Sequence, residues 1–304
     1  MMLKDCAKDA RALGRFAQYG TLAWVASWGW SCGVAADAAG TLSGKSRGVA
    51  ARLAAMGLLE AKPWQHSNHI KTHYFLTKAG LEHAVENQDW AREFSREHGY
   101  PFSPLPQKIQ PLKSHSAVHD LFCQLLCVTA LIKDDPQYGR AATYYATPDL
   151  YSGYSRGQKI PDFLIIRERS EDIFEFEYSK KSRPEILNFI DHYYRQSQAP
   201  GDKKKRVFVR SISKGIENQF LSGWKPGELV GSFGRDRGGR WMQTDLMGSR
   251  IERGPAECGV DFSVLDDGWT GLLRTLSGLG KLPPISSSPP PAQAQTGVVN
   301  GIDW

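Results

Sequence analysis

Residues 159–182 read KIPDFLIIRERSEDIFEFEYSKKS, and this stretch decides the fold of the second half of the chain. Two apolar runs flank the polar stretch RERSED, a pattern that predicts a β-hairpin. If the turn centres on the second R and the S of that stretch, Asp162 lies opposite Glu177. The same register puts Leu164 opposite Glu175. The hairpin is therefore expected to carry three carboxylates on one face.

The acidic face of this hairpin needs a positive charge. Side chains two apart on a strand point the same way, so Glu175 and Glu177 project together. Phe174, Phe176 and Tyr178 project to the other side. Like charges at close range repel and raise one another's pKa unless a cation neutralises them. Because hard oxygen ligands suit Mg²⁺ or Mn²⁺, the sequence predicts a divalent-metal site.

Each of these carboxylates also has a structural interpretation. Asp162 follows a proline and could cap a turn. Glu175 and Glu177 could form a solvated strand face, and Lys180 could pair with one of them. Against this, strand residues flanked by Phe and Ile are expected to be central in a sheet, where unpaired carboxylates are costly to desolvate. The metal site is the preferred interpretation.

The N-terminal part of the chain has the outline of a helix-turn-helix. The expected elements are helices over residues 3–28, 33–40 and 45–59, strands over 58–64 and 69–76, and a further helix from residue 77. Gly14 or Gly20 is expected to break the first helix. In the third helix, Val49, Leu53 and Met56 share one face and are expected to form its core contact.

The segments RGVAARLAAMGLLEAKP and HYFLTKAGLE resemble sequences of the winged-helix DNA-binding family. The resemblance covers residues 10–86. The resemblance implies that one helix faces a DNA groove and that the strand pair, the wing, touches phosphates. The residues expected to contact DNA are Ser43, Lys45, Ser46, Arg47 and Arg52 in the helix and Lys62, His66, His69 and Lys71 in the wing. Residues 41–78 contain six Lys or Arg and one acidic residue, and this positive charge favours DNA binding. The alternative is a solvated basic face on a protein-interaction module.

In the second half of the chain, the alternation of helical and strand patterns predicts an α/β core, so the protein is expected to be α+β overall. Its expected order is helix 115–133, strands 142–147, 161–168 and 172–178, helix 183–198, strand 206–211 and helix 215–224. The expected domains are a winged helix at 1–99, a Pro-rich linker at 100–114, the core at 115–280 and a disordered Pro- and Ser-rich tail at 281–304. The role of residues 225–280 is left open.

The motif PD, then a strand, then EFE with a lysine just beyond, is similar to the PD-(D/E)xK nuclease superfamily in its E-x-E variant. With the helix HSAVHDLFCQLL, the strand KRVFVRS and the preceding winged helix, the chain resembles the MobC-type relaxases and replication-relaxation proteins of mobile plasmids. The resemblance implies a restriction-endonuclease-like mixed sheet. It implies that Asp162 and Glu175 bind metal and that Glu177 is a third ligand or a base. Lys180 would contact phosphate, and His115 matches a histidine that opens this helix.

The expected function is a nicking protein that selects a site in double-stranded DNA, such as a plasmid origin, and hydrolyses a phosphodiester with Mg²⁺ or Mn²⁺. The chain lacks the His-hydrophobic-His motif of the more familiar relaxases, so Tyr193 and Tyr194 are expected in the core or a groove wall, not as nucleophiles. Two alternatives stay open. One is a plasmid replication or transcription regulator whose core only grips DNA. The other is an adaptor that recruits a coupling ATPase or transfer-complex proteins through the tail.

Composition agrees with an anionic partner. A net charge of +6 over 304 residues suits nucleic acid or an acidic membrane surface. Basic segments that would complete a DNA channel contain Lys181, Arg183, Lys203, Lys204, Lys205, Arg206, Arg235, Arg237 and Arg240. Each could equally be a solubilising surface run.

The five cysteines are an odd set without a C-x-x-C pair, which indicates reduced thiols. Cys123 and Cys127 stand four apart in an apolar helical run and are expected to pack in the core, not to bind metal. The N-terminus lacks the apolar core of a signal peptide, and no run approaches the ~20 residues of a membrane span. The expected location is the cytoplasm.

Overall fold

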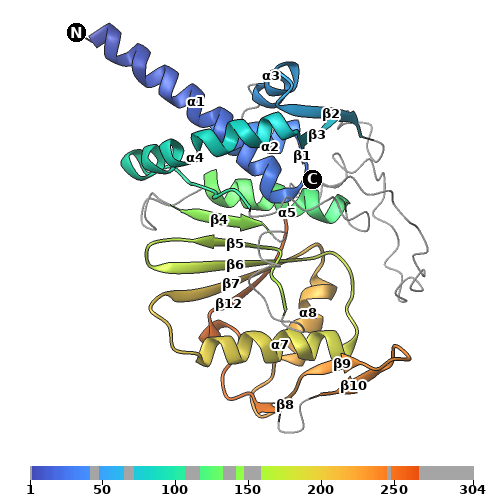
Figure 1. Cartoon of the computed structure of the whole chain (residues 1–304). Coiled ribbons are helices and arrows are strands. Elements are labelled where there is room, and N and C mark those ends of the chain that lie inside the picture. The colour runs from blue at the N-terminus through green and yellow to red at the C-terminus, as the bar shows by residue number, and fades with distance from the viewer. Residues whose placement is uncertain are drawn as a thin grey trace.

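A computed structural model of the chain describes residues 2–41, 48–64, 72–106, 117–132, 142–146, 159–244 and 248–266. The described chain is mixed α/β, as the alternation of helical and strand patterns predicted. A mainly helical N-terminal part lies above a β-sheet that has helices on both faces (Figure 1). The predicted disordered tail lies outside the described residues.

The N-terminal part combines helices with a small sheet. Its elements are α1 (Met2–Trp28), β1 (Ser31–Cys32), α2 (Gly33–Thr41), α3 (Val49–Ala55), β2 (Leu59–Pro63), β3 (Thr72–Leu76) and α4 (Lys78–His98). In this part of the described chain, β1, β3 and β2 form an antiparallel sheet in that order, with Leu59 opposite Leu76. Thr77 caps α4 by accepting a hydrogen bond from the Gly80 N–H at 3.0 Å. The expected helices and the strand pair are present in the described residues, with the differences in the first and third helices given below.

The expected break in the first helix is wrong, because α1 runs without interruption past both glycines. Gly20 serves a different purpose: a Cβ there would lie 3.1 Å from the Cα of Gly40. At Gly40 a Cβ would overlap the Thr21 hydroxyl oxygen and lie 2.5 Å from the Ala17 carbonyl oxygen. The glycines let α1 and α2 approach closely, a use of glycine that does not bend a helix.

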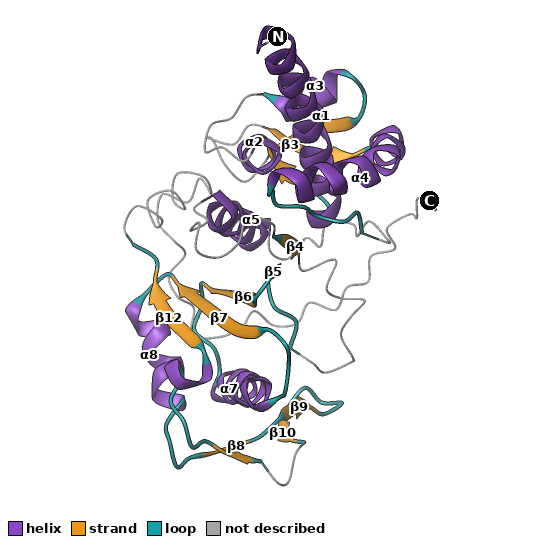
Figure 2. Cartoon of the chain, turned by 90° about the vertical axis from the view of Figure 1, so that its left-hand side faces the viewer, coloured by secondary structure: helices purple, strands orange, loops and turns teal. Residues whose placement is uncertain are grey.

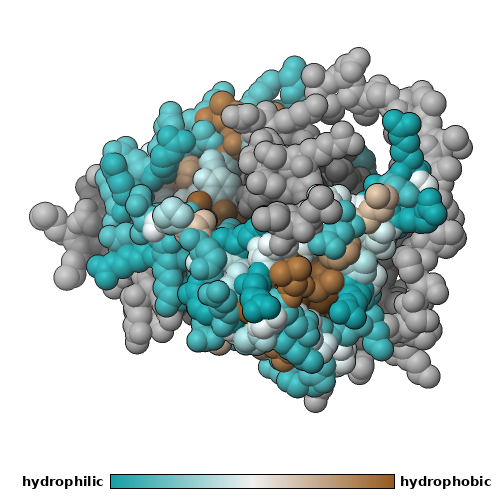
Figure 3. Space-filling view, turned by 90° about the horizontal axis from the view of Figure 1, so that it is seen from below, coloured by the Kyte–Doolittle hydropathy of each residue, from teal (hydrophilic) through white to brown (hydrophobic). Residues whose placement is uncertain are grey.

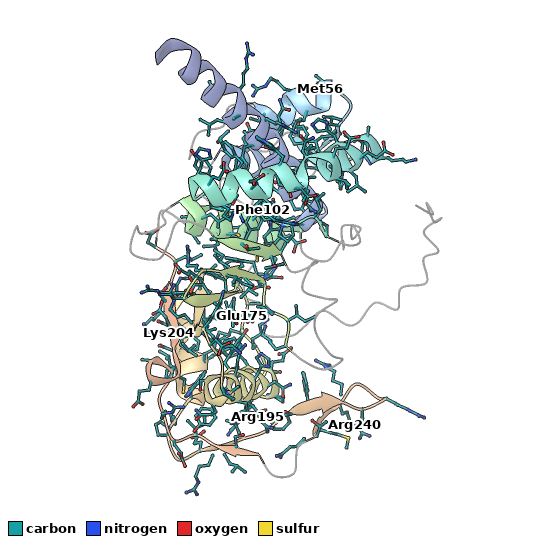
Figure 4. The ribbon with its side chains drawn as sticks, turned by 60° about the vertical axis from the view of Figure 1, so that its left-hand side comes forward. Met56, Phe102, Glu175, Arg195, Lys204 and Arg240 are labelled. Carbon is teal, nitrogen blue, oxygen red and sulfur yellow. The ribbon has the colours of Figure 1, made fainter. Side chains whose placement is uncertain are left out.

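α3 is shorter than expected, and one of its predicted core residues faces solvent. Val49 and Leu53 are buried, but Met56 is 60 % exposed and lies at the far end of the molecule from Glu175 (Figure 4). The helix ends one residue before Met56, and Gly57 turns the chain with a φ of 75°. Because of this turn, the neighbouring Leu58 is buried in place of Met56.

The larger sheet contains the elements predicted for the second half. Its strands and the helices around it are α5 (Ala117–Ile132), β4 (Thr143–Ala146), β5 (Phe163–Ile166), β6 (Ser170–Glu177), α7 (Arg183–Gln198), β7 (Lys204–Ser211), α8 (Lys214–Gly223) and β12 (Val260–Val264). Within the described ranges the strand order is β12-β7-β6-β5-β4. β5 is antiparallel to both neighbours, whereas β6, β7 and β12 are parallel. The sheet is therefore mixed, with α5 on one face and α7 and α8 on the other (Figure 2).

The stretch that the sequence left unassigned supplies β12 and a small accessory layer beyond α7. That layer consists of β8 (Leu229–Val230), β9 (Phe233–Arg235), β10 (Trp241–Gln243), β11 (Ser249–Arg250) and the short helix η3 (Ala256–Cys258). β9 pairs with β10 and β8 with β11. Asn188 of α7 holds the layer by donating to the Phe233 carbonyl at 2.8 Å.

The hairpin of β5 and β6 forms as predicted, but its register differs from the expected one by two residues. Leu164 lies opposite Ile173 instead of Glu175. The same register brings Asp162, just before β5, level with Glu175 instead of Glu177. Because the difference is an even number of residues, the side chains within β5 and β6 keep their expected faces. Asp162 lies just before β5 and contacts α5 through His119, whereas Glu175 contacts α7, so the expectation that the carboxylates share one face is wrong for Asp162.

The position of the turn explains the difference in register. Glu168 and Arg169 are exposed and form the turn, whereas Ser170 is buried and pairs with Lys204 of β7. The expected register would have placed Glu168 in the strand and Ser170 in the turn. Burying a charged side chain costs far more than burying a hydroxyl, so the observed turn is favoured.

One core connects the N-terminal part to the sheet. The ring of Trp24 in α1 packs 5.3 Å from that of Tyr144 in β4. The buried Gln124 of α5 accepts hydrogen bonds from the Ser31 hydroxyl at 2.7 Å and from the Trp24 indole at 3.3 Å. Phe102, in the expected linker, exchanges backbone hydrogen bonds with β4 and the residue before it. The start of the Pro-rich segment is thus built into the junction.

We expect Gly40→Ala to lower the free energy of unfolding by about 1–3 kcal/mol, because the added methyl group overlaps the Thr21 hydroxyl oxygen and the Ala17 carbonyl. Gly14→Ala is the matched control, since a Cβ at Gly14 meets nothing within 4 Å. It should stabilise α1 by about 0.5–1 kcal/mol through helix propensity. Urea denaturation followed by circular dichroism measures both, and equal effects at the two positions would contradict the close approach of α1 and α2.

Candidate functional site

β6 lies in the middle of the sheet and presents different side chains to its two faces. Glu175 faces α7, where it meets Tyr193. Phe176 faces α5 and stacks on Phe122 at 4.9 Å between ring centroids. Because helices cover both faces, Glu175 is only 1 % and Glu177 only 4 % exposed. The two glutamates are therefore withdrawn from solvent, and each needs a partner.

Lys159 supplies the positive charge at the centre of this acidic group. Its ammonium nitrogen lies 2.8 Å from the Glu175 Oε2 atom, and its side chain is 33 % exposed. Burial works against the charge on Lys159, but Glu175, Glu177 and Asp162 outweigh it and raise the pKa of the lysine. The lysine therefore stays charged and is shared electrostatically by all three carboxylates.

Glu175 is poised to exchange a proton near neutral pH. Burial raises its pKa to about 7, and the negative charge of Asp162 adds to this effect. Lys159 and the Tyr193 hydroxyl, which donates to Glu175 Oε1, act in the opposite direction. A carboxyl group with a pKa close to the working pH can act as a general acid or base.

Asp162 is held as an anion at the start of β5. Its Oδ2 atom accepts a hydrogen bond from the Phe176 N–H at 2.6 Å, and its Oδ1 atom lies 3.5 Å from His119 Nε2. Burial opposes the charge, but His119, Lys159 and this N–H together lower the pKa of Asp162. Glu177 is neutralised separately by Lys181 at 3.0 Å.

The expected metal site fits this arrangement in part. Asp162 and Glu175 are hard oxygen donors on adjacent strands, as Mg²⁺ or Mn²⁺ requires. An ion bound between them would have to displace Lys159 from Glu175. In the described part of the chain, the group of three ligand-type side chains whose ligand atoms lie within 4.8 Å of one another is His119, Cys123 and Asp162. Two of these were not expected to bind metal.

The basic residues expected around the site lie in different places. Lys181 and Arg183 line a groove of about 440 Å³ between α7 and α8, together with Lys225. Lys204 pairs with Ser170 at the opposite end of β6 from Glu177, so it lies away from the carboxylates (Figure 4). The lower surface, which holds α7 and the accessory layer, is largely hydrophilic with a small hydrophobic patch (Figure 3).

The remaining expected site residues are exposed or not described. Lys180 is exposed beyond the end of β6, and in the N-terminal part Arg52 of α3 and Lys62 of β2 are also exposed. Lys62 pairs with Glu60 at 3.0 Å. The other predicted DNA-binding and catalytic residues lie outside the described ranges: Ser43, Lys45, Ser46, Arg47, His66, His69, Lys71 and His115.

Sequence reasoning did not identify Lys159 or His119 as site residues. Lys159 stands three residues before Asp162 in KIPD, where a lysine is normally a solvated surface residue. His119 and Cys123 are four apart in HDLFC, a spacing that puts both on one helix face and was a usable signal. Tyr193 was expected in the core or a groove wall, and it is buried, but its hydroxyl also donates to Glu175.

Comparison of the chain with models of protein families finds no match, and comparisons with curated proteins and with solved structures find no significant match either. None of the described helices has the length and apolar character needed to cross a membrane. The function must therefore be argued from the geometry of the chain's own residues.

We expect Glu175 to make stability depend on pH. Its pKa is about 7 in the folded chain against 4.5 for the free group, so between these values the folded chain binds more protons than the unfolded chain. The free energy of unfolding should therefore fall as pH rises from 4.5 to about 7. Glu175→Gln should flatten this dependence, whereas Glu168→Gln, in the exposed turn, should not. Urea denaturation across this pH range tests it, and equal slopes in wild type and Glu175→Gln would contradict it.

Proposed function

We propose that this protein binds double-stranded DNA through its N-terminal part and hydrolyses a phosphodiester at the site formed by Asp162, Lys159 and Glu175. The observation that carries the proposal is the convergence of two carboxylates, one just before β5 and one in β6, on the half-buried ammonium group of Lys159. An acid, a base and a cation held in so small a volume are the components that phosphodiester hydrolysis requires.

The architecture of the sheet supports a nuclease-like core. The described chain runs from α5 through the antiparallel strands β4, β5 and β6 to α7, and then to β7 parallel to β6. This is the order that the resemblance to restriction-endonuclease-like proteins implies, and the candidate carboxylates stand on its second and third strands. The order α1, β1, α2, α3, β2, β3 likewise supports a winged-helix module at the N-terminus.

The side chains of the site have distinct parts in the proposed reaction. Glu175, with its pKa raised to about 7 by burial, accepts the proton of the attacking water. Lys159 stabilises the negative charge that develops on the phosphate oxygens. If a Mg²⁺ or Mn²⁺ ion were held by Asp162 and Glu175, Glu175 would be a ligand instead of the base, and the ion would polarise the phosphodiester and lower the pKa of the attacking water. Lys181 and Arg183 in the basic groove contact the DNA backbone next to the site.

On this proposal the protein acts as a nicking or relaxation protein at an origin of a mobile plasmid. The winged helix selects the site, and the core cuts one strand. A coupling ATPase or other transfer-complex protein would then be a partner, reached through the tail.

A second candidate is a DNA-binding regulator that does not cut. The ion pairs Lys159–Glu175 and Lys181–Glu177 favour it, because they already neutralise the carboxylates without a metal. The two candidates share DNA binding and differ only in the fate of the phosphodiester.

Nicking of supercoiled plasmid separates the two candidates. We expect the wild-type protein to produce open circles with Mg²⁺ or Mn²⁺, and Glu175→Gln and Asp162→Asn to slow this by about 10²-fold or more, because each removes a group that acts on the reacting atoms. Glu171→Gln, on the same strand but near its start, is the matched control and should nick at the wild-type rate. If wild type binds plasmid but leaves it supercoiled, the regulator is correct.

DNA binding by the N-terminal part predicts a specific salt dependence. Replacing Arg52 and Lys62 together by glutamine should weaken binding to a DNA duplex, because two cations that neutralise phosphates are removed. The slope of log affinity against log salt should become shallower by roughly 0.9 for each phosphate that is no longer neutralised. Arg96→Gln, exposed near the end of α4, is the control and should change neither quantity. Fluorescence anisotropy at several salt concentrations measures both, and an unchanged slope in the double variant would place the DNA surface elsewhere.

A further inference from the structure

We propose that His119, Cys123 and Asp162 form a zinc site that joins α5 to the start of β5. This proposal does not depend on DNA cleavage, since it concerns a metal of a different class and two ligands outside the catalytic group. The three side chains come from two elements, and their ligand atoms all lie within 4.8 Å of one another.

The distances among the three ligand atoms suit a tetrahedral ion. Ligand atoms about 2.0–2.3 Å from zinc lie roughly 3.3–3.8 Å from each other. Here His119 Nε2 lies 3.5 Å from Asp162 Oδ1 and 3.9 Å from Cys123 Sγ, and it also lies 3.3 Å from the Phe176 carbonyl oxygen. To bind zinc, His119 Nε2 would turn from the Phe176 carbonyl to the ion, and the ligand atoms, now within 4.8 Å of one another, would draw together around it.

The surroundings orient the ligands as in a metal site. Asp120 Oδ1 lies 3.7 Å from His119 Nδ1, the ring nitrogen that would not bind the ion. A carboxylate behind a metal-binding histidine fixes its tautomer and directs the other nitrogen to the ion. Asp162 is fixed in the same way by the Phe176 N–H, which donates to Oδ2 and leaves Oδ1 toward the histidine.

The donor set selects the metal. One sulfur, one imidazole nitrogen and one carboxylate oxygen are the mixed donors that zinc takes, whereas Mg²⁺ takes oxygen. Zinc binds the thiolate, so the Cys123 proton passes to solvent as the ion enters. Three protein ligands leave a fourth position for water. Cys127 lies one turn further along α5 and does not belong to the group.

The zinc site would connect α5 to the acidic group around Lys159. α5 packs against the N-terminal part, and Asp162 belongs to the acidic group around Lys159. A zinc ion on Oδ1 would hold the carboxylate in the orientation that places it beside Glu175. It would thereby act as a positioning element for the proposed active site, without touching the substrate.

Metal analysis of the full chain tests the proposal. Protein incubated with Zn²⁺ and dialysed should retain about one zinc per chain, and the melting temperature should rise by roughly 5–10 °C at zinc concentrations about a hundredfold above the Kd. Substituted Co²⁺ should give a thiolate-to-cobalt charge-transfer band in the near ultraviolet. Cys123→Ser should lose this band and at least tenfold in zinc affinity, while Cys127→Ser should keep both.

The failure of this proposal and of the proposed function can be told apart. Glu175→Gln should retain zinc and lose nicking, whereas His119→Gln should lose zinc while its far-ultraviolet circular dichroism shows the fold intact. Wild-type protein that retains no zinc and gives no charge-transfer band would overturn the zinc site and leave an ion pair between His119 and Asp162. That outcome needs no variant, so it does not depend on whether the substituted chains fold.

Discussion

The half-buried ammonium group of Lys159 lies among three carboxylates, and the central strand depends on it. β6 is covered on both faces, so Glu175 and Glu177 are almost fully withdrawn from bulk water. Removing one partner of a buried ion pair costs about 3–5 kcal/mol, because the other charge stays behind unpaired. A strand with two buried glutamates is tolerable only while lysines remain beside them.

The same arrangement makes the site chemically unusual. Neighbouring groups push the two carboxyl pKa values apart: burial raises that of Glu175, whereas His119 and Lys159 overcome burial to lower that of Asp162. Pairs of acids with divergent pKa values divide the tasks of proton transfer and charge stabilisation in many enzymes. The hairpin therefore joins a structural requirement, the neutralisation of buried charge, to a proposed chemical use of the same residues.

Local patterns were sufficient to predict most of the helices and strands up to α8 and their order. Alternating apolar residues predicted β5 and β6, and the Thr77 cap and the strand pair β2 and β3 followed from short-range signals. The predicted hairpin register was wrong because the two possible turns fit the sequence pattern equally well. They differ only in whether Glu168 or Ser170 is buried, which the local pattern does not show. β12 could not be predicted, because its pairing with β7 joins residues about fifty apart and no local pattern encodes it.

The sequence identified the acidic residues of the candidate site but not the lysine that pairs with them. Asp162, Glu175 and Glu177 were evident from their spacing on a hairpin, whereas the position of Lys159 depends on a segment outside the regular strands. The sequence predicted a metal ion as the neutralising charge, and the structure shows that Lys159 also lies beside Glu175. Whether a side chain or an ion provides the charge is decided by three-dimensional proximity, which the spacing of residues along the chain does not report.

The shared core between the N-terminal part and the sheet has a consequence for how the chain holds together. Trp24 and Tyr144 cover each other, and the amide of Gln124 satisfies polar groups of the opposite part. Cutting the chain in the Pro-rich segment would leave an aromatic face and a buried amide open to water on both pieces. The two halves should consequently melt together in one cooperative transition, and neither fragment would be a faithful substitute for the intact protein.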